Sequence, residues 1–563
     1  MRVVALGLDA AEPWVVDRML DAGAMPNLAA LRERGARADL ENTLAYRAEV
    51  PWTQFATGVP PKDSGYWTMV SFDPSDYAVW EHGAYDYASH PPFWHELGDR
   101  RSIVFDVPQV RITDGFRGSI VTAWGSHSPQ YPRAARPQGL LAEIDERFGV
   151  HPGFEQDNEP CWFDPAYLRA MSDAMCAGAR RRASILTWLR DREPEWDLLV
   201  SVMGESHSME HHCFHGLDPS HAFHGHMGTS HLAVELATDA FRAIDYAIGA
   251  TLDGLPDDTT VLVFSLHGMR PNASDISGPL LAEVFHRVNF GHPRMLGPNP
   301  RWWKARGMPL LEPEGRWSVH MRHRFRDAPR TGLAAKLPWE VLEARQRLLR
   351  RLRGTSRPQR PAFPPIPIEP ETELRPDQLL DDPRTSVGWQ IPTWYERHWP
   401  EMRAFVLPAY SDCHVRINLA GRERFGQVAP EDYDVACDEV EAIVRGCVNP
   451  RTGRPAFGEV LRVRADDPHD PDGPTADLVV VPEGDVFDAL EHPEAGLVGP
   501  YPVFRTGEHS PNGFLVAAGP GIEAGTDLGA RSALDVTPTI LSLLDRPVPD
   551  RFAGSPIFAP AVS

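Results

Sequence analysis

The chain has 563 residues, of which 42% are hydrophobic, and carries a formal net charge of −22. Its size and apolar content predict a large folded core with an insertion or cap, and they exclude disorder over the whole length. The negative charge argues against a broad nucleic-acid-binding surface, because such surfaces gather Lys and Arg.

The first predicted element is a buried parallel strand. Residues 3–8 form a short apolar run that ends at Asp9, a polar residue at the carboxyl end. The clearest helix covers Leu232–Leu252, where apolar residues follow a helical period. Further buried strands are predicted at Ser102–Val107, Ser119–Ala123, Asp197–Met203, Thr260–Ser265, Asp477–Val481 and Gly513–Ala518. Strands that alternate with helices predict an α/β fold, a doubly wound, mostly parallel sheet with helices on both faces.

The middle of the chain differs in composition. Residues 284–399 are rich in Pro, Arg and Trp and show little strand periodicity, so we expect an insertion or cap. The predicted core then has a first part at 1–283 and a second part at 400–563. The tryptophans of the insertion, such as Trp302, Trp303 and Trp317, either cover an organic substrate or anchor local packing.

The cysteines and the start of the chain bear on its location. Six cysteines are scattered without a Cys-x-x-Cys pair, which is typical of reduced thiols in a cytoplasmic protein. The chain begins with a strand-like run rather than a leader, and no apolar stretch approaches the roughly 18 residues of a membrane helix. We therefore expect a cytoplasmic protein that does not bind membranes.

Potential metal ligands border four of the predicted strands. Asp9 and His267 follow two of them, His207 and His211 follow a third, and His509 precedes the last. His207 and His211 are four residues apart, so one helical turn brings both imidazoles to the same face. A single histidine is more often a hydrogen-bonded polar residue than a ligand. Because ligands bind beyond the carboxyl ends of strands in such sheets, we predict that these five residues converge at one edge.

The residues of several segments, and the order of these segments along the chain, resemble the type I phosphodiesterase/nucleotide pyrophosphatase branch of the alkaline-phosphatase superfamily. The resemblance runs nearly end to end and rests on segments 25–28 (Met-Pro-Asn-Leu), 51–58 (Pro-Trp-Thr-Gln-Phe-Ala-Thr-Gly), 417–423 and 535–541. It implies an alkaline-phosphatase-like fold with two metal ions, usually zinc, beside a Ser or Thr nucleophile. By motif, Asp9 and His267 would serve one ion, and His211 and His509 the other.

Three positions depart from the family pattern. Leu266 stands where the family has an Asp ligand, His207 replaces another Asp, and Ala48 falls at the nucleophile's place. A small alignment gap would bring in Thr43 or Thr53 instead. The departures predict one ion held by the histidines, with His267 or Asp9 as a further ligand. A nitrogen-rich site suits zinc, iron, manganese or copper better than magnesium or calcium.

These residues predict a metal-dependent hydrolase of a phosphate or related ester. Direct attack by metal-bound water is expected on a small anionic substrate, because alanine cannot act as a nucleophile. Glu49 or Glu205 is the predicted general base, and Arg47 and His127 are predicted to bind the substrate anion. Each of these four residues has an equally simple structural role as its alternative.

Two other functions stay open at this point. The altered ligands could support another metal-dependent reaction, such as a transfer, lyase or oxidative step in specialised metabolism. The chain could also be a pseudoenzyme that binds a ligand or partner. A random loss of ligands explains Leu266 but not His207, which is itself a good ligand. The sequence leaves the metal, the substrate and the oligomeric state undetermined.

Overall fold

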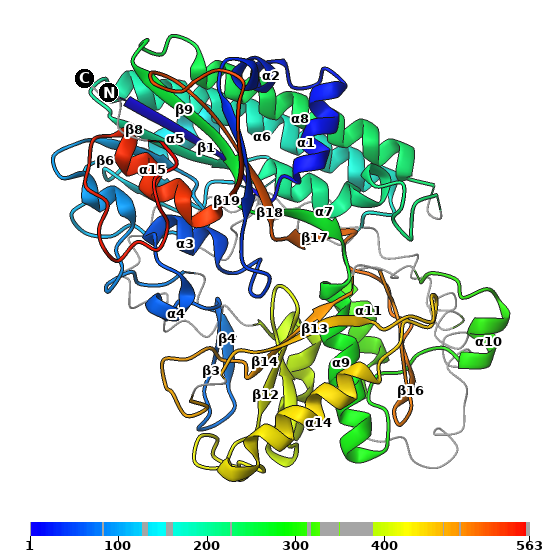
Figure 1. Cartoon of the computed structure of the whole chain (residues 1–563). Coiled ribbons are helices and arrows are strands. Elements are labelled where there is room, and N and C mark those ends of the chain that lie inside the picture. Colours follow the sequence, from blue (N-terminus) through cyan, green and yellow to red (C-terminus); the bar gives the residue numbers. More distant parts are fainter. Residues whose placement is uncertain are drawn as a thin grey trace.

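The computed structural model describes residues 2–81, 84–125, 133–153, 161–225, 228–311, 317–326, 348, 387–464, 467–483 and 486–558. Within these residues, nine strands form the main sheet, and five of the eight neighbouring pairs are parallel (Figure 1). Their spatial order is β19 (Thr526–Ser532), β2 (Ala36–Glu41), β18 (Asn512–Ala518), β9 (Thr259–Ser265), β1 (Arg2–Leu8), β8 (Leu198–Met203), β5 (Ser102–Phe105), β6 (Gly118–Thr122) and β7 (Ala134–Arg136).

Helices cover both faces of this sheet, which explains the near-continuous apolar strands. In β1, Val4 and Leu6 pack into one hydrophobic cluster, while Val3 and Ala5 pack into another on the opposite face. The first cluster is completed by α1 (Pro13–Asp21), α2 (Pro26–Glu33), α5 (Leu140–Phe148), α6 (Pro165–Arg192), α7 (Glu205–Leu217) and α8 (Ser230–Leu252). The second is completed by α3 (Pro51–Thr57), η1 (Phe93–Leu97) and α15 (Val536–Leu543). The predicted doubly wound, mostly parallel α/β fold is confirmed.

A second, antiparallel sheet forms a separate unit, drawn below the main sheet in Figure 1. It packs with helices in a hydrophobic cluster of its own. The strand order is β11 (Ala404–Leu407), β12 (Cys413–Ile417), β14 (Leu478–Pro482) and β13 (Phe457–Arg462), and the helices include α9 (Ser274–Phe290), α11 (Trp317–Arg324), η4 (Ile391–Glu401) and α14 (Tyr433–Arg445).

The second sheet corrects one strand assignment. The run predicted at Asp477–Val481 is β14, which pairs antiparallel with β12 and β13 and takes no part in the main sheet. A buried strand has the same apolar pattern in either sheet, so the local sequence could not distinguish them. Segment 400–563 thus contributes to both sheets, and the domain boundaries at 283 and 399 stay a prediction.

Two tryptophans of the predicted insertion serve packing. Trp303 in α10 (Pro300–Ala305) is fully buried and donates its indole N–H to the Pro309 carbonyl at 3.0 Å. Trp317 is also buried and donates to the Pro502 carbonyl at 2.7 Å. Across the described segments, no helix combines the length and the apolar character that a membrane crossing requires.

Candidate metal centre

Three adjacent parallel strands position the first residues of the candidate site. The strands β9, β1 and β8 are neighbours in the main sheet, so their carboxyl ends meet at one edge. Asp9 directly follows β1, His267 lies two residues beyond β9, and His207 lies in the first turn of α7, which begins shortly after β8. The strand ends therefore bring these side chains together from distant parts of the chain.

Helix α7 carries two histidines on one buried face. The Nε2 atoms of His207 and His211 are 3.0 Å apart, as their spacing of one helical turn predicts. The other ring nitrogen of His211, Nδ1, lies 2.6 Å from the Gly507 carbonyl oxygen. That carbonyl can only accept, so Nδ1 carries the proton and Nε2 of His211 carries a lone pair directed at His207.

A short antiparallel ribbon adds the third histidine. The ribbon consists of β10 (Gly268–Pro271) and β17 (Gly507–Ser510), with Met269 opposite His509. The ring centroid of His509 lies 5.1 Å from that of His207 and 5.2 Å from that of His211. One potential ligand nitrogen of each of these three histidines lies within 4.8 Å of those of the other two.

Asp9 and His267 complete the group beside His509. The rings of His267 and His509 are 4.8 Å apart, and Nε2 of His267 is 3.6 Å from Oδ1 of Asp9. The same Oδ1 accepts a 2.7 Å hydrogen bond from the Trp52 indole. The predicted convergence is confirmed; the group, called here the histidine cluster, comprises Asp9, His207, His211, His267 and His509.

The electrostatics of this cluster suit a metal ion. All five side chains are at most 8% exposed. Burial, followed by the charges of Arg505 and His509, holds the pKa of His211 well below its ordinary value, so this imidazole stays neutral. Neutral imidazoles with the second nitrogen bonded to a carbonyl are typical metal ligands. The residues present therefore fit a nitrogen-preferring transition metal such as zinc.

A second polar group, the ion cluster of Arg47, Arg270, Asp412 and Glu508, adjoins the histidines. Arg47 is fully buried and contacts Asp412 at 2.6 Å, Glu508 at 3.2 Å and the His509 carbonyl at 2.6 Å. Arg270 pairs with Glu508 at 2.6 Å. Every nitrogen of Arg47 has a protein partner, including the Leu44 carbonyl. Arg47 thus holds β17 against the loop before α3, and its role in substrate binding stays a prediction.

The two predicted bases have opposite environments. Burial raises the pKa of Glu49 to about 7, despite hydrogen bonds from Ser411, with Oγ at 2.7 Å. Burial also opposes ionisation of Glu205, but Arg182 and His151 outweigh it and lower its pKa to about 2. The Glu205 carboxylate lies 3.3 Å from Arg182 and 3.2 Å from His151. Glu205 is therefore a weak base held in an ion pair.

Ala48, at the predicted nucleophile position, lies in the loop before α3. The Ala48 backbone N–H donates to Ser411 Oγ at 3.4 Å. Both alternative hydroxyls are directed to other protein groups: Thr43 donates to the Ala45 carbonyl at 2.9 Å, and Thr53 contacts Gln109 at 3.1 Å. His127, the other predicted substrate ligand, lies outside the described residues.

Sequence reasoning missed Asp412 and Glu508, which hold Arg47. Glu508 directly precedes His509, a predicted metal ligand, and this position was the available signal. Asp412 carries no such signal, because its partner Arg47 is more than three hundred residues away in sequence. Asp412 has a positive φ of 62°, a strained conformation for a residue other than glycine.

Several solved structures are similar to this chain at low sequence identity. Among solved structures, murine ectonucleotide pyrophosphatase/phosphodiesterase 5 is 11% identical, with 98% of this chain and 96% of that chain covered and a TM-score of 0.45. The human ectonucleotide pyrophosphatase/phosphodiesterase 5 is 12% identical, with coverage of 99% and 97% and a TM-score of 0.45. Phosphonoacetate hydrolase from Sinorhizobium meliloti 1021, in complex with phosphonoformate, is 14% identical, with coverage of 95% and 94% and a TM-score of 0.41.

Sequence comparison gives the decisive result. No curated protein matches the chain at the level of sequence. The family model for type I phosphodiesterase/nucleotide pyrophosphatase, however, matches residues 3–326, more than half of the chain. The matched segment contains four of the five residues of the histidine cluster, all except His509. The chain belongs to the type I phosphodiesterase/nucleotide pyrophosphatase family.

Proposed function

We propose that the protein hydrolyses a phosphate ester or a related ester with one divalent transition-metal ion held by His207, His211 and His509. The main observation behind this proposal is that three buried imidazoles lie close together. Their potential ligand nitrogens are within 4.8 Å of one another. Family membership supports the class of reaction. The hydrogen bond from His211 Nδ1 to the Gly507 carbonyl, with a nitrogen–oxygen distance of 2.6 Å, supports a pre-set ligand geometry.

His267 and Asp9 complete the proposed coordination. The Asp9 carboxylate would add negative charge to an otherwise neutral set of nitrogen ligands. Its Oδ1 is oriented by the Trp52 indole at 2.7 Å and lies 3.6 Å from His267. A bound ion supplies Lewis-acid chemistry: it stabilises negative charge on phosphoryl oxygens and lowers the pKa of water.

The residues around Ala48 support attack by water rather than by a side chain. Alanine offers no nucleophilic atom at the position that the family pattern gives to a hydroxyl. Glu49, with a pKa of about 7, is the better of the two predicted bases, because it takes up a proton near neutral pH. Glu205, with a pKa of about 2, serves instead to fix the start of α7 through Arg182.

The proposal is tested by metal reconstitution. Protein treated with a chelator is assayed with bis(4-nitrophenyl) phosphate before and after addition of zinc, manganese or iron(II). We expect activity to return with about one ion per chain. In His211→Ala the return should fall at least a hundredfold, whereas His286→Ala, which removes another fully buried histidine, should respond like the wild type. Equal activity with and without metal would contradict the proposal.

The water-attack step has its own test. A phosphorothioate diester of known configuration at phosphorus is hydrolysed in ¹⁸O-labelled water, and the configuration of the product is determined. One direct displacement inverts the configuration, while a covalent intermediate requires two displacements and retains it. We expect inversion. Retention would show that a side-chain nucleophile acts, and Thr43, Thr53 and Ser411 would then be replaced one at a time to identify it.

A further inference from the structure

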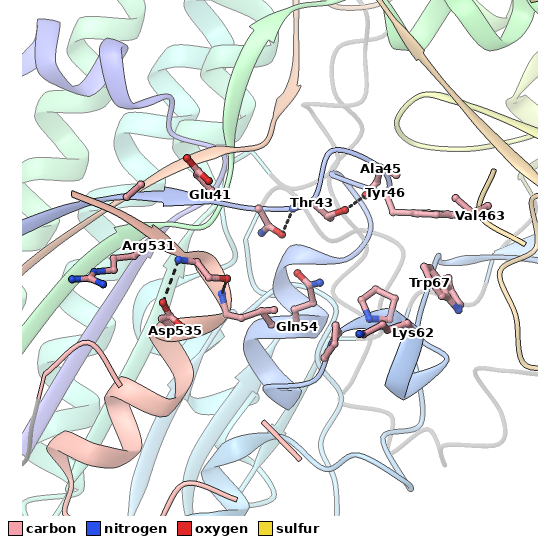
Figure 2. Close-up of a pocket in the computed structure, with 16 residues that line it drawn as sticks. Glu41, Thr43, Ala45, Tyr46, Gln54, Lys62, Trp67, Val463, Arg531 and Asp535 are labelled. Carbon is pink, nitrogen blue, oxygen red and sulfur yellow. Dashed lines mark hydrogen bonds between the residues drawn. The ribbon is translucent and has the colours of Figure 1, made fainter. Parts of the chain in front are cut away.

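The loop before α3 is held by a turn of the second unit. Loop 42–50 runs from β2 to α3, and its first half borders an open cavity of about 770 Å³ (Figure 2). Its second half instead contacts segment 410–412, which lies between the paired strands β11 and β12. Asp412 of this turn forms an ion pair with Arg47 of the loop at 2.6 Å. The position of the loop therefore depends on the docking of the second unit.

Ser411 makes the central contacts of this turn. Its Oγ donates to Glu49 Oε2 at 2.7 Å and accepts from the Ala48 N–H at 3.4 Å. The other carboxylate oxygen, Oε1 of Glu49, accepts from the Tyr410 and Ser411 N–H groups at 3.1 and 3.4 Å. Both side chains are buried, with Ser411 2% and Glu49 1% exposed. Both oxygens of Glu49 are thus oriented by the turn of the second unit.

The surroundings of Glu49 make the Ser411 hydroxyl important for its protonation. Burial raises the pKa of Glu49 to about 7, and the hydrogen bond from Ser411 is the largest influence in the opposite direction. Other ionisable side chains that face Glu49 are Arg47, Asp412, Tyr46 and Tyr85. The two phenols are neutral because burial raises their pKa, and the other two groups pair with each other. Loss of the Ser411 hydroxyl should therefore raise the pKa of Glu49 further.

We propose that Ser411 is a positioning residue that holds Glu49 in place as the base beside Ala48. The inference rests on the proposed function, in which water attacks the ester and Glu49 accepts its proton. The hydroxyl donates to the ionised carboxylate, so it stabilises the form that can accept a proton. It also fixes the carboxylate relative to the loop, because the same oxygen atom bonds the Ala48 N–H. The second unit thereby contributes to the arrangement of the base.

The pH dependence of hydrolysis tests this role. With metal-loaded protein, kcat/KM for bis(4-nitrophenyl) phosphate is measured from pH 5 to pH 9, and it should rise as Glu49 loses its proton. In Ser411→Ala the rise should move up by about one pH unit, which lowers the rate about tenfold at pH 6 and much less at pH 9. A uniform fall at every pH would show a merely structural role and overturn the proposal.

Two control variants accompany Ser411→Ala. Ser411→Thr keeps the hydroxyl and should restore the wild-type pH profile. Ser172→Ala removes another hydroxyl that is 2% exposed, one that donates to the Leu236 carbonyl at 3.1 Å, and should leave the profile unchanged. If Ser411→Ala does not fold, Ser411→Cys supplies a weaker donor of similar size and should move the profile in the same direction by a smaller amount.

A second measurement follows Glu49 without turnover. Urea unfolding of the metal-free protein is recorded from pH 5 to pH 9, and each protein is compared with its Glu49→Gln counterpart. The stabilising contribution of protonated Glu49 falls with rising pH, and this fall should end near pH 7 in the wild type and near pH 8 in Ser411→Ala. An end point that stays near pH 7 would overturn the proposal, whatever the rate does.

The two measurements separate this inference from the proposed function. An end point that moves without the rate profile would show that Glu49 is not the base, which refutes the role of Ser411 but leaves metal-dependent hydrolysis intact. Absence of metal-dependent hydrolysis in the wild type would contradict the proposed function. In that case a moved end point would still show that Ser411 controls the protonation of Glu49.

Discussion

The histidine cluster and the ion cluster lie side by side and share strand β17. They differ in the groups that they could offer to a bound cation. Glu508 and His509 are consecutive, and successive side chains of a strand point to opposite sides. On one side, Arg47 is closed in by Asp412 and Glu508 at 2.6 and 3.2 Å. On the other side, the imidazoles of the histidine cluster face one another. The ion cluster balances its own charge, whereas the histidine cluster retains lone pairs that can hold a cation.

From this difference we infer that the ion cluster stabilises the fold and that the histidine cluster binds the metal. Removing one partner of a buried ion pair leaves an uncompensated charge, so the ion cluster should affect stability. His211 stays neutral, so its removal leaves no unpaired charge behind. The histidine cluster should therefore affect metal affinity more than folding. The predictions that follow test this separation, from the largest expected effect to the smallest.

The largest effect is expected for Arg47→Ala. The variant leaves the buried carboxylate of Asp412 without its partner, while Glu508 keeps Arg270. This should lower the free energy of unfolding by about 3–5 kcal/mol. Urea unfolding measures the loss. The control is Arg32→Ala, which breaks an exposed contact with Asp17 and should cost less than about 1 kcal/mol. A similar loss of unfolding free energy in both variants would contradict the stabilising role of the ion cluster.

The pH dependence of stability should reveal Glu49, which lies beside the ion cluster. Its pKa rises from 4.5 to about 7 on folding, so the folded protein holds a proton that the unfolded chain releases. The contribution of Glu49 is full below pH 4.5 and is lost as the pH rises through about 7. It amounts to about 3 kcal/mol.

Urea unfolding of the wild type and Glu49→Gln at pH 5 and pH 8 isolates this contribution. Other buried carboxyls with raised pKa values, such as Glu12, act alike in both proteins and cancel. We expect the wild type to lose about 2.5 kcal/mol more than the variant between the two pH values, because part of the contribution is already lost at pH 5. Parallel pH profiles would show that Glu49 titrates normally and would weaken its proposed role as a base.

His207→Ala should act on metal affinity. The loss of one of three imidazole ligands should weaken zinc binding about a hundredfold, or about 2.7 kcal/mol, with a smaller change in the stability of the metal-free protein. Competition with a chromophoric chelator measures the affinity, and His286→Ala is again the buried control. In His207→Asp the added carboxylate should retain binding and shift preference toward zinc or manganese. Unchanged affinity in His207→Ala would mean that His207 is a structural histidine.

The smallest effect concerns the orientation of Asp9. Trp52→Phe keeps an aromatic ring against the sheet but removes the indole donor that bonds Asp9 Oδ1 at 2.7 Å. If Asp9 contributes to the metal site, zinc affinity should fall up to about tenfold, the size of effects from residues that orient ligands. An unchanged affinity together with normal stability would leave the three histidines as the complete ligand set.

The sequence predicted those parts of the molecule that depend on local pattern. Asp9, His207 and His267 each follow an apolar strand, and the carboxyl ends of adjacent parallel strands must share an edge, so their meeting was foreseeable. The ion pair of Arg47 with Asp412 could not be foreseen, because Asp412 comes from the second unit and meets Arg47 only after folding. For the same reason the Asp477–Val481 run was placed in the wrong sheet. Its apolar pattern indicates that the strand is buried but not which strands it pairs with.

Anomalous diffraction at a metal absorption edge tests the central claim most directly. Crystals are grown from protein purified without added metal, and peaks are located with the edges of zinc, iron and manganese. The account predicts one peak per chain, within about 2.0–2.2 Å of one ring nitrogen each of His207, His211 and His509. Two peaks flanking Asp9 and His509 would restore the two-metal arrangement of the family. A peak elsewhere, or none after soaking in metal, would contradict the histidine cluster as a metal centre.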